Sequence, residues 1–163
     1  MKKVINSPLL LFIPLLIIMI ISFMDMQNAK LLSDLYEKNL IKQVIWYIAG
    51  FLILFIISKV NIHTILKYSK YYYWLSIILL VLVLFFGKET NGAKAWFNFG
   101  ILSFQPSELT KLTLILYLSN IASRSKPDFK LILKVAILTI IPSILVFLEP
   151  DTGAIIFYLL SAI

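Results

Sequence analysis

The sequence contains no cysteine, a single histidine and only eight acidic residues among its 163 residues. The absence of cysteine excludes disulfides, thiol catalysis and cysteine-ligated metal centres. Charged residues make up 14% of the chain and hydrophobic residues 61%, whereas soluble domains average about 25% and about 45–50%. This balance excludes a disordered chain, a fibrous repeat and an ordinary cytosolic globule. It predicts a polytopic membrane protein.

Long runs without charge predict the membrane spans, because about 20 apolar residues cross the hydrocarbon core as a helix. We expect an all-α integral membrane protein, a helical bundle with spans at residues 4–24, 43–58, 71–87, 106–123, 131–148 and 152–163. The last run is short, which predicts the N-terminal part of a larger membrane protein. Between the spans we expect a polar loop with a short amphipathic stretch at 25–43 and a basic loop at 61–70.

The distribution of basic residues predicts the orientation of the chain. The net charge is +7, but the lysines lie between apolar runs, which favours membrane orientation over nucleic-acid binding. With the N terminus in the cytoplasm, most basic residues, including Lys67 and Arg124, fall inside and most acids fall outside. Lys38 and Lys94 are then expected outside. Lys67 and Lys70 are expected to contact anionic lipid of the inner leaflet.

Residues 91–104 are apolar but interrupted by Gly92 and Gly100. Their aromatic side chains are typical of a segment at the membrane surface. Pro106 then fits the first turn of a helix, where its missing N–H costs nothing, and Ser107 and Glu108 are good first-turn residues.

Two polar groupings each leave two interpretations open. Glu108 and Lys111 share one helix face by their spacing, and they form either a structural ion pair or the polar lining of a cavity for a charged lipid headgroup. Glu149 and Asp151 are either a pair for a divalent cation or acid–base chemistry, or a turn in which Asp151 caps the next helix. We favour the cap. The lone His63 is expected to be a surface residue.

Three segments together resemble motifs of the SEDS family, the shape, elongation, division and sporulation proteins that include RodA, FtsW and SpoVE. NGAKAWFNFG at 91–100 resembles N-G-A-K/R-R-W-hydrophobic-x-x-G, and FQPSELTKL at 104–112 resembles F-Q-P-S-E-hydrophobic-x-K-hydrophobic. EPDTGAIIFYL at 149–159 resembles Q/E-P-D-x-G-T/A. The start of the second span, LIKQVIWYIAG at 40–50, gives further support. The short N terminus resembles RodA more than FtsW.

The resemblance implies a ten-span fold of which this chain holds the first half. It implies a glycosyltransferase that polymerises lipid II at the outer face of the bacterial cytoplasmic membrane, in cell elongation or division, with a class B penicillin-binding protein as partner. In the implied inverting reaction a carboxylate base activates the acceptor hydroxyl, and undecaprenyl pyrophosphate leaves with help from Mg²⁺ or Mn²⁺. The family's catalytic Asp lies in the second half. No catalytic residue or metal ligand is therefore assigned here, and the segment alone is predicted to be inactive.

The resemblance also carries over individual positions of the first half. The implied substrate-binding residues are Lys94, Trp96, Gln105, Ser107, Glu108, Lys111 and Asp151, and the implied structural positions are Gly92, Pro106, Pro150 and Gly153. Lys94 or Lys111 is expected to meet the pyrophosphate charge as a point cation. Ala95 stands where the family commonly has arginine. Two other functions suit a charged groove with access to lipid: a flippase for lipid-linked precursors, and a non-catalytic scaffold for a penicillin-binding protein.

Overall fold

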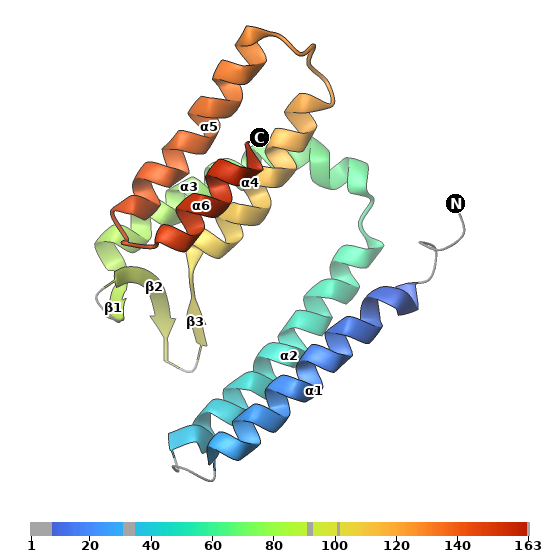
Figure 1. Ribbon diagram of the computed structural model, residues 1–163, viewed down its shortest axis with the longest axis vertical. Coiled ribbons are helices and arrows are strands. Elements are labelled where there is room, and N and C mark those ends of the chain that lie inside the picture. Colours follow the sequence, from blue (N-terminus) through green and yellow to red (C-terminus); the bar gives the residue numbers. More distant parts are fainter. Residues whose placement is uncertain (1–7, 31–34, 91–92, 101, 163) are drawn as a thin grey trace. The chain divides into compact units, whose positions relative to one another are not determined.

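The computed structural model describes residues 8–30, 35–90, 93–100 and 102–162. The chain divides into two compact units, Met1–Ile57 and Ser58–Ile163, and helices predominate in both (Figure 1). Among the described residues, three apolar segments are long enough to cross a membrane: Leu40–Ser58, Ile62–Phe86 and Phe129–Phe147. The fold is therefore that of a predominantly helical, polytopic membrane protein, as predicted.

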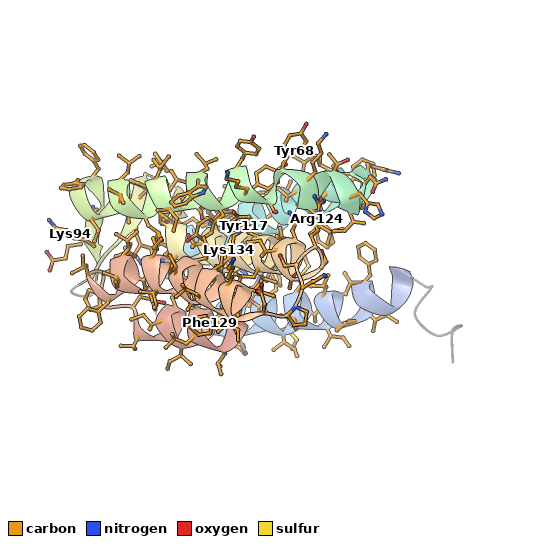
Figure 2. The ribbon with its side chains drawn as sticks, turned by 90° about the horizontal axis from the view of Figure 1, so that it is seen from above. Tyr68, Lys94, Tyr117, Arg124, Phe129 and Lys134 are labelled. Carbon is orange, nitrogen blue, oxygen red and sulfur yellow. The ribbon has the colours of Figure 1, made fainter. Side chains whose placement is uncertain are left out.

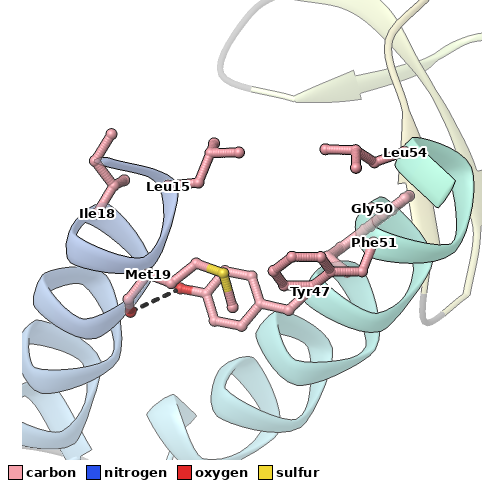
Figure 3. Close-up of a pocket in the computed structure, with 8 residues that line it drawn as sticks. Leu15, Ile18, Met19, Tyr47, Gly50, Phe51 and Leu54 are labelled. Atoms are coloured by element: carbon pink, nitrogen blue, oxygen red, sulfur yellow. Dashed lines mark hydrogen bonds between the residues drawn. The ribbon is translucent and has the colours of Figure 1, made fainter. Parts of the chain in front are cut away.

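The first unit contains α1 (Pro8–Lys30) and all of α2 (Leu35–Lys59) except its last two residues. Two hydrogen bonds of 3.3 Å join them, from the Tyr47 hydroxyl to the Met19 carbonyl and from Gln43 Nε2 to Ser22 Oγ. Between the helices lies an apolar groove of about 310 Å³ in which Gly50 leaves space (Figure 3). Many large apolar side chains of the described part of both helices are exposed, as expected of helices that face lipid.

The predicted polar loop at 25–43 is wrong, because α1 continues to Lys30 and α2 already begins at Leu35. Residues 25–43 contain neither proline nor glycine, and they include four leucines and three lysines. Such residues favour helix even where the sequence is polar, so hydropathy marks the apolar part of a helix rather than its ends.

The second unit contains α3 (Ile62–Phe86), α4 (Pro106–Ala122), α5 (Phe129–Phe147) and α6 (Thr152–Ser161). The helices surround a core of large side chains that includes Tyr73, Leu80, Leu114, Val146 and Tyr158. The hydroxyl of the buried Tyr73 donates to the Leu138 carbonyl at 2.8 Å, and Ser76 Oγ lies 2.9 Å from Thr113 Oγ1. Small polar side chains thus join α3 to its neighbours, as is common between membrane helices.

Helix α3 begins nine residues before the predicted span at 71–87, so the predicted basic loop at 61–70 is wrong. Asn61 is the N-cap, and its side-chain oxygen accepts from the His63 backbone N–H at 2.9 Å. Asparagine at this position stabilises a helix start, and the lysines that follow lie on exposed positions of the helix. His63 is exposed, as predicted.

A small antiparallel sheet connects α3 to α4, and nothing in the hydropathy predicted it. Its strands are β1 (Lys88–Thr90), β2 (Ala93–Phe99) and β3 (Leu102–Phe104), in that order. Phe97 pairs with Phe104, and Phe99 with Leu102. The turn between β2 and β3 contains Gly100 at φ +82°, a conformation that favours glycine, and β3 leads directly into Pro106 at the start of α4.

Candidate functional site

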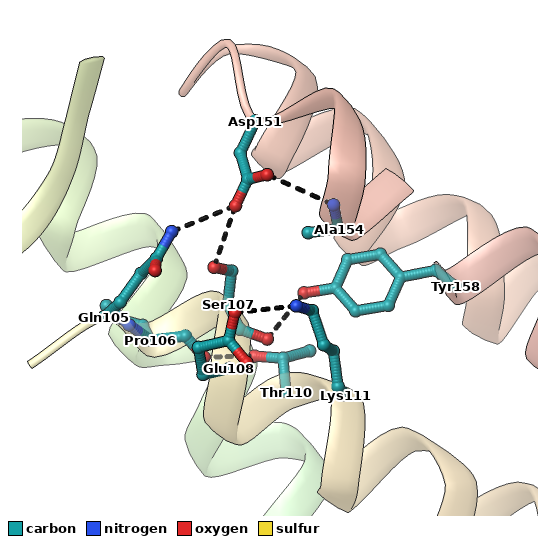
Figure 4. Close-up of polar contacts among 9 residues, drawn as sticks. All are labelled: Gln105, Pro106, Ser107, Glu108, Thr110, Lys111, Asp151, Ala154 and Tyr158. Atoms are coloured by element: carbon teal, nitrogen blue, oxygen red, sulfur yellow. Dashed lines mark hydrogen bonds and ion pairs between the residues drawn. The ribbon is translucent and has the colours of Figure 1, made fainter. Parts of the chain in front are cut away.

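The N-terminal end of α4 meets the turn between α5 and α6, and Asp151 joins the two (Figure 4). One carboxylate oxygen of Asp151 accepts from the Ala154 backbone N–H at 3.1 Å, so Asp151 caps α6 as predicted. The other oxygen accepts from Gln105 Nε2 at 2.9 Å and from Ser107 Oγ at 3.3 Å. The second and third sequence motifs are therefore joined through one carboxylate.

Two residues that sequence reasoning missed complete this contact. The buried Tyr158 hydroxyl donates to the Ser107 carbonyl at 3.0 Å, and Thr110 Oγ1 donates to the Pro106 carbonyl at 2.9 Å. Tyr158 lies two turns after Asp151 on the same face of α6, so its spacing in EPDTGAIIFYL was a usable signal. A buried tyrosine hydroxyl normally finds a partner, and here that partner is the first turn of α4.

Glu108 and Lys111 form the predicted ion pair, with 2.7 Å between Lys111 Nζ and the Glu108 carboxylate. The lysine side chain is 20% exposed and the glutamate side chain 60%. The pair is thus not deeply buried among the described residues, and its contribution to stability is that of an exposed pair, at most about 1 kcal/mol. In this structure the pair holds Lys111 Nζ beside the Glu108 carboxylate.

Both charged residues line a cavity of about 520 Å³ with Phe104, Leu109, Leu112 and Phe157. Lys111 Nζ also lies 5.6 Å from the centroid of the Phe157 ring, a distance at which the ring face attracts a cation. One cation among apolar and aromatic walls suits a ligand with an anionic group on an apolar chain. Glu108 and Phe157 together orient that cation.

Glu149 occupies the turn between α5 and α6 and is fully buried. Neither of its carboxylate oxygens has a hydrogen-bond partner among the described residues. Burial and, to a smaller extent, the neighbouring Asp151 carboxylate together raise the pKa of Glu149 from 4.5 to about 7. The two carboxylates that the sequence presents as a pair therefore have different roles, Asp151 as a cap and Glu149 as a buried acid.

The described residues contain no group of three or more histidine or acidic side chains placed to hold a metal ion. Glu149 is buried, and both oxygens of Asp151 are engaged by Gln105, Ser107 and Ala154. These residues therefore do not fit a divalent cation.

The remaining predicted residues lie on or near the sheet. Lys94 is exposed and Trp96 half-buried, both on β2, and no described contact joins either to Lys111 or Asp151. Ala95, which stands where the family commonly has arginine, is buried at 2% exposure. The exposed basic residue of this strand is its neighbour Lys94. Pro150 is exposed in the turn, and Gly153 lies in the first turn of α6. Gly92 lies outside the described residues.

Substitution of Asp151 separates its role as a cap from its charge. Asp151→Ala removes the acceptor for Ala154, Gln105 and Ser107 and is expected to cost about 1–2 kcal/mol of unfolding free energy. Asp151→Asn keeps a side-chain oxygen for the cap and is expected to cost less than half of that. Thermal unfolding of both purified variants measures the difference, and equal losses would contradict the capping role.

Comparison with known proteins gives consistent similarities over nearly the whole chain. A family model of cell cycle proteins, named for FtsW, RodA and SpoVE, matches residues 3–163. The chain is 30% identical over 125 residues to the peptidoglycan glycosyltransferase RodA of Treponema pallidum, covering 76% of this chain and 29% of that protein.

Two solved structures are also similar to this chain. One is a chain of a structure described as structural coordination of polymerization and crosslinking by a peptidoglycan synthase complex, with 35% identity, a TM-score of 0.69, and coverage of 74% of this chain and 36% of that one. The other is the rod shape determining protein RodA of Thermus thermophilus, with 34% identity, a TM-score of 0.66, and coverage of 71% and 39%. The chain thus spans about a third of the length of the proteins it matches.

Proposed function

Because this chain belongs to the FtsW/RodA/SpoVE family of cell cycle proteins, we propose that it is the N-terminal part of a peptidoglycan glycosyltransferase. The proposed reaction is polymerisation of lipid II at the outer face of the bacterial cytoplasmic membrane. The proposed role of this segment is to bind the pyrophosphate and the adjoining part of the lipid chain. The catalytic base belongs to the part of the family fold that this segment does not contain.

The observation that carries the proposal is Lys111 held at an apolar cavity by Glu108 and Phe157. A pyrophosphate on a polyprenyl chain combines the two features that this cavity accommodates, a concentrated negative charge and an apolar chain. In the transfer, the anomeric carbon–oxygen bond breaks and negative charge grows on the pyrophosphate. A cation fixed beforehand at that position stabilises the charge as it develops.

The hydrogen bonds around Asp151 support the proposed role of Lys111, because they fix the start of the helix that carries it. Asp151 and Tyr158 hold the first turn of α4, at Ser107, against α6. Glu108 and Lys111 follow within that turn and the next. A contact that fixes the start of the helix therefore fixes the cation, and small displacements of a positioned group cost large factors in rate.

The partners and the cofactor are part of the proposal for the whole protein. A class B penicillin-binding protein is the proposed partner, which is supported by the similarity to a chain of a peptidoglycan synthase complex. Mg²⁺ or Mn²⁺ is the proposed companion of the pyrophosphate, bound through groups outside the described residues of this segment. Lys94 and Trp96 on β2, with Gln105 at the end of the sheet, are the proposed outer contacts to the substrate.

Polymerisation by the purified full-length protein tests the proposed function. With lipid II and Mn²⁺ or Mg²⁺, we expect glycan chains on a gel, in the absence of any other polymerase. Absence of chains from a folded protein that moves lipid II across vesicle membranes would instead indicate a flippase. A protein that does neither, yet binds a penicillin-binding protein, would indicate a scaffold.

We also propose that the N terminus lies in the cytoplasm, on the basis of the lysine and arginine distribution. Lys67 lies near the start of α3 and Lys94 in the sheet that follows its other end, and both are exposed. Because the chain has no cysteine, Lys67→Cys and Lys94→Cys each provide a single thiol. An impermeant maleimide is expected to label position 94 but not position 67 in intact cells. Labelling of position 67 alone would show the opposite orientation and contradict the proposal.

A further inference from the structure

A second polar cavity lies at the end of the second unit where α4 leads into α5, away from the sheet that carries Lys94 (Figure 2). It measures about 190 Å³, and we call it the lysine pocket. Its lining residues are Ser125, Lys126, Asp128, Lys130, Leu131 and Lys134. None of them belongs to the site described above.

The lysine pocket has a net positive charge, because three lysines and only one carboxylate line it. Lys130 and Lys134 lie one turn apart on α5, and Lys126 precedes the helix. No ion pair joins these three lysines to another described residue. The only acidic residue of the lining, Asp128, caps α5 by accepting from the Leu131 backbone N–H at 2.8 Å. Three lysines and one aspartate therefore line this cavity, which leaves it with a net positive charge.

An apolar groove continues from the same lysines along α5. This groove, of about 250 Å³, is lined by Lys130, Leu133 and Lys134 and further along by Ile137 and Leu138. Helix α5 is one of the segments long enough to cross a membrane. The lysines occupy its first turns, so they lie at the depth of the headgroups, and the groove runs from there toward the hydrocarbon.

We propose that the lysine pocket and this groove form a binding site for one anionic phospholipid. The headgroup phosphate lies among the ammonium groups of Lys126, Lys130 and Lys134, and an acyl chain follows the groove past Leu133 and Ile137. Basic pockets between membrane helices bind anionic headgroups in this way. A free phosphate ion accounts for the lysines but leaves the adjoining apolar groove without an occupant, and this favours the lipid.

Native mass spectrometry of the full-length protein in neutral detergent tests the site. The probes are phosphatidylglycerol, phosphatidylcholine and inorganic phosphate. We expect phosphatidylglycerol to bind as a discrete adduct that phosphatidylcholine does not replace and that millimolar phosphate does not displace. The double variant Lys130→Gln/Lys134→Gln is expected to weaken this binding by about 30-fold. Each lysine near an anionic headgroup contributes about 1 kcal/mol of binding free energy, and every 1.4 kcal/mol corresponds to about tenfold in affinity.

The matched control is Lys67→Gln/Lys70→Gln, which removes two exposed lysines of α3 that are expected to attract anionic lipid in general but do not line the pocket. It is expected to change the discrete adduct by less than about 3-fold. Equal loss in both double variants would mean general attraction to charge and would overturn the site. Displacement of phosphatidylglycerol by inorganic phosphate would contradict the assignment of a lipid as the occupant. Thermal unfolding of each variant verifies that it is folded, which is expected because all four lysines are exposed.

Discussion

Lys111→Met is expected to lower polymerisation of lipid II by the full-length protein by at least about 100-fold, the loss typical of removing one fixed group that stabilises developing charge. Its abundance in the membrane should stay near that of the wild type. The Glu108 side chain is 60% exposed and the Lys111 side chain 20%, so the ion pair is not deeply buried and removing it costs folding at most about 1 kcal/mol. A steady-state assay with membrane abundance measured in parallel separates the two effects.

Two further variants decide whether Lys111 acts through its charge. Glu108→Gln keeps the cation but loosens its position, so we expect a smaller loss than for Lys111→Met. The double variant Glu108→Gln/Lys111→Met should be as inactive as Lys111→Met, because it also lacks the positive charge at position 111. The matched control is Lys88→Met, an exposed lysine of β1 that does not line the cavity, and it should retain most activity. An active Lys111→Met would refute the role of this cavity in the reaction.

Glu149→Gln is expected to remove a pH dependence of stability that the wild type has. The pKa of Glu149 rises from 4.5 in the unfolded chain to about 7 in the folded protein. The folded state then binds the proton more tightly, so the stabilisation is fully present below pH 4.5 and is lost as the pH rises through about 7. The shift corresponds to as much as about 3 kcal/mol, since neither carboxylate oxygen has a described partner that would favour the ion.

Thermal unfolding of wild type and Glu149→Gln between pH 5 and pH 8 measures this effect. The glutamine variant should be more stable than wild type at pH 8, and the difference should shrink as the pH falls. Taking the difference between the two proteins cancels the titration of all other groups. A difference that stays constant across this range would contradict the buried, unpartnered state of Glu149.

The local rules of helix ends made the site partly predictable. Proline followed by serine and glutamate predicted the start of α4 at Pro106, and the i,i+3 spacing predicted the Glu108–Lys111 pair. Asp151 was predicted as a cap from its place before an apolar run. Each of these features depends on neighbours within one turn of helix, which a sequence shows directly.

Features that depend on distant contacts were not predictable in the same way. The strands Lys88–Thr90, Ala93–Phe99 and Leu102–Phe104 form a sheet, although hydropathy describes this part of the chain only as an apolar segment with glycines. Tyr158 reaches Ser107 across 51 positions of sequence, and the burial of Glu149 depends on how α4, α5 and α6 come together. The start of α3 at Ile62 was missed for a different reason. Its lysines interrupt the apolar run by which the span was predicted, although lysine is compatible with a helix.

Photocrosslinking of lipid II to the cavity tests the central claim most directly. A photoreactive amino acid is placed at Leu112 or Phe157, which line the cavity of Lys111. The comparison position is Ile132, an exposed apolar residue of α5 that does not line that cavity. We predict that labelled lipid II crosslinks at positions 112 and 157, that unlabelled lipid II competes, and that Lys111→Met reduces the yield. Crosslinking no stronger at these positions than at position 132 would contradict the account.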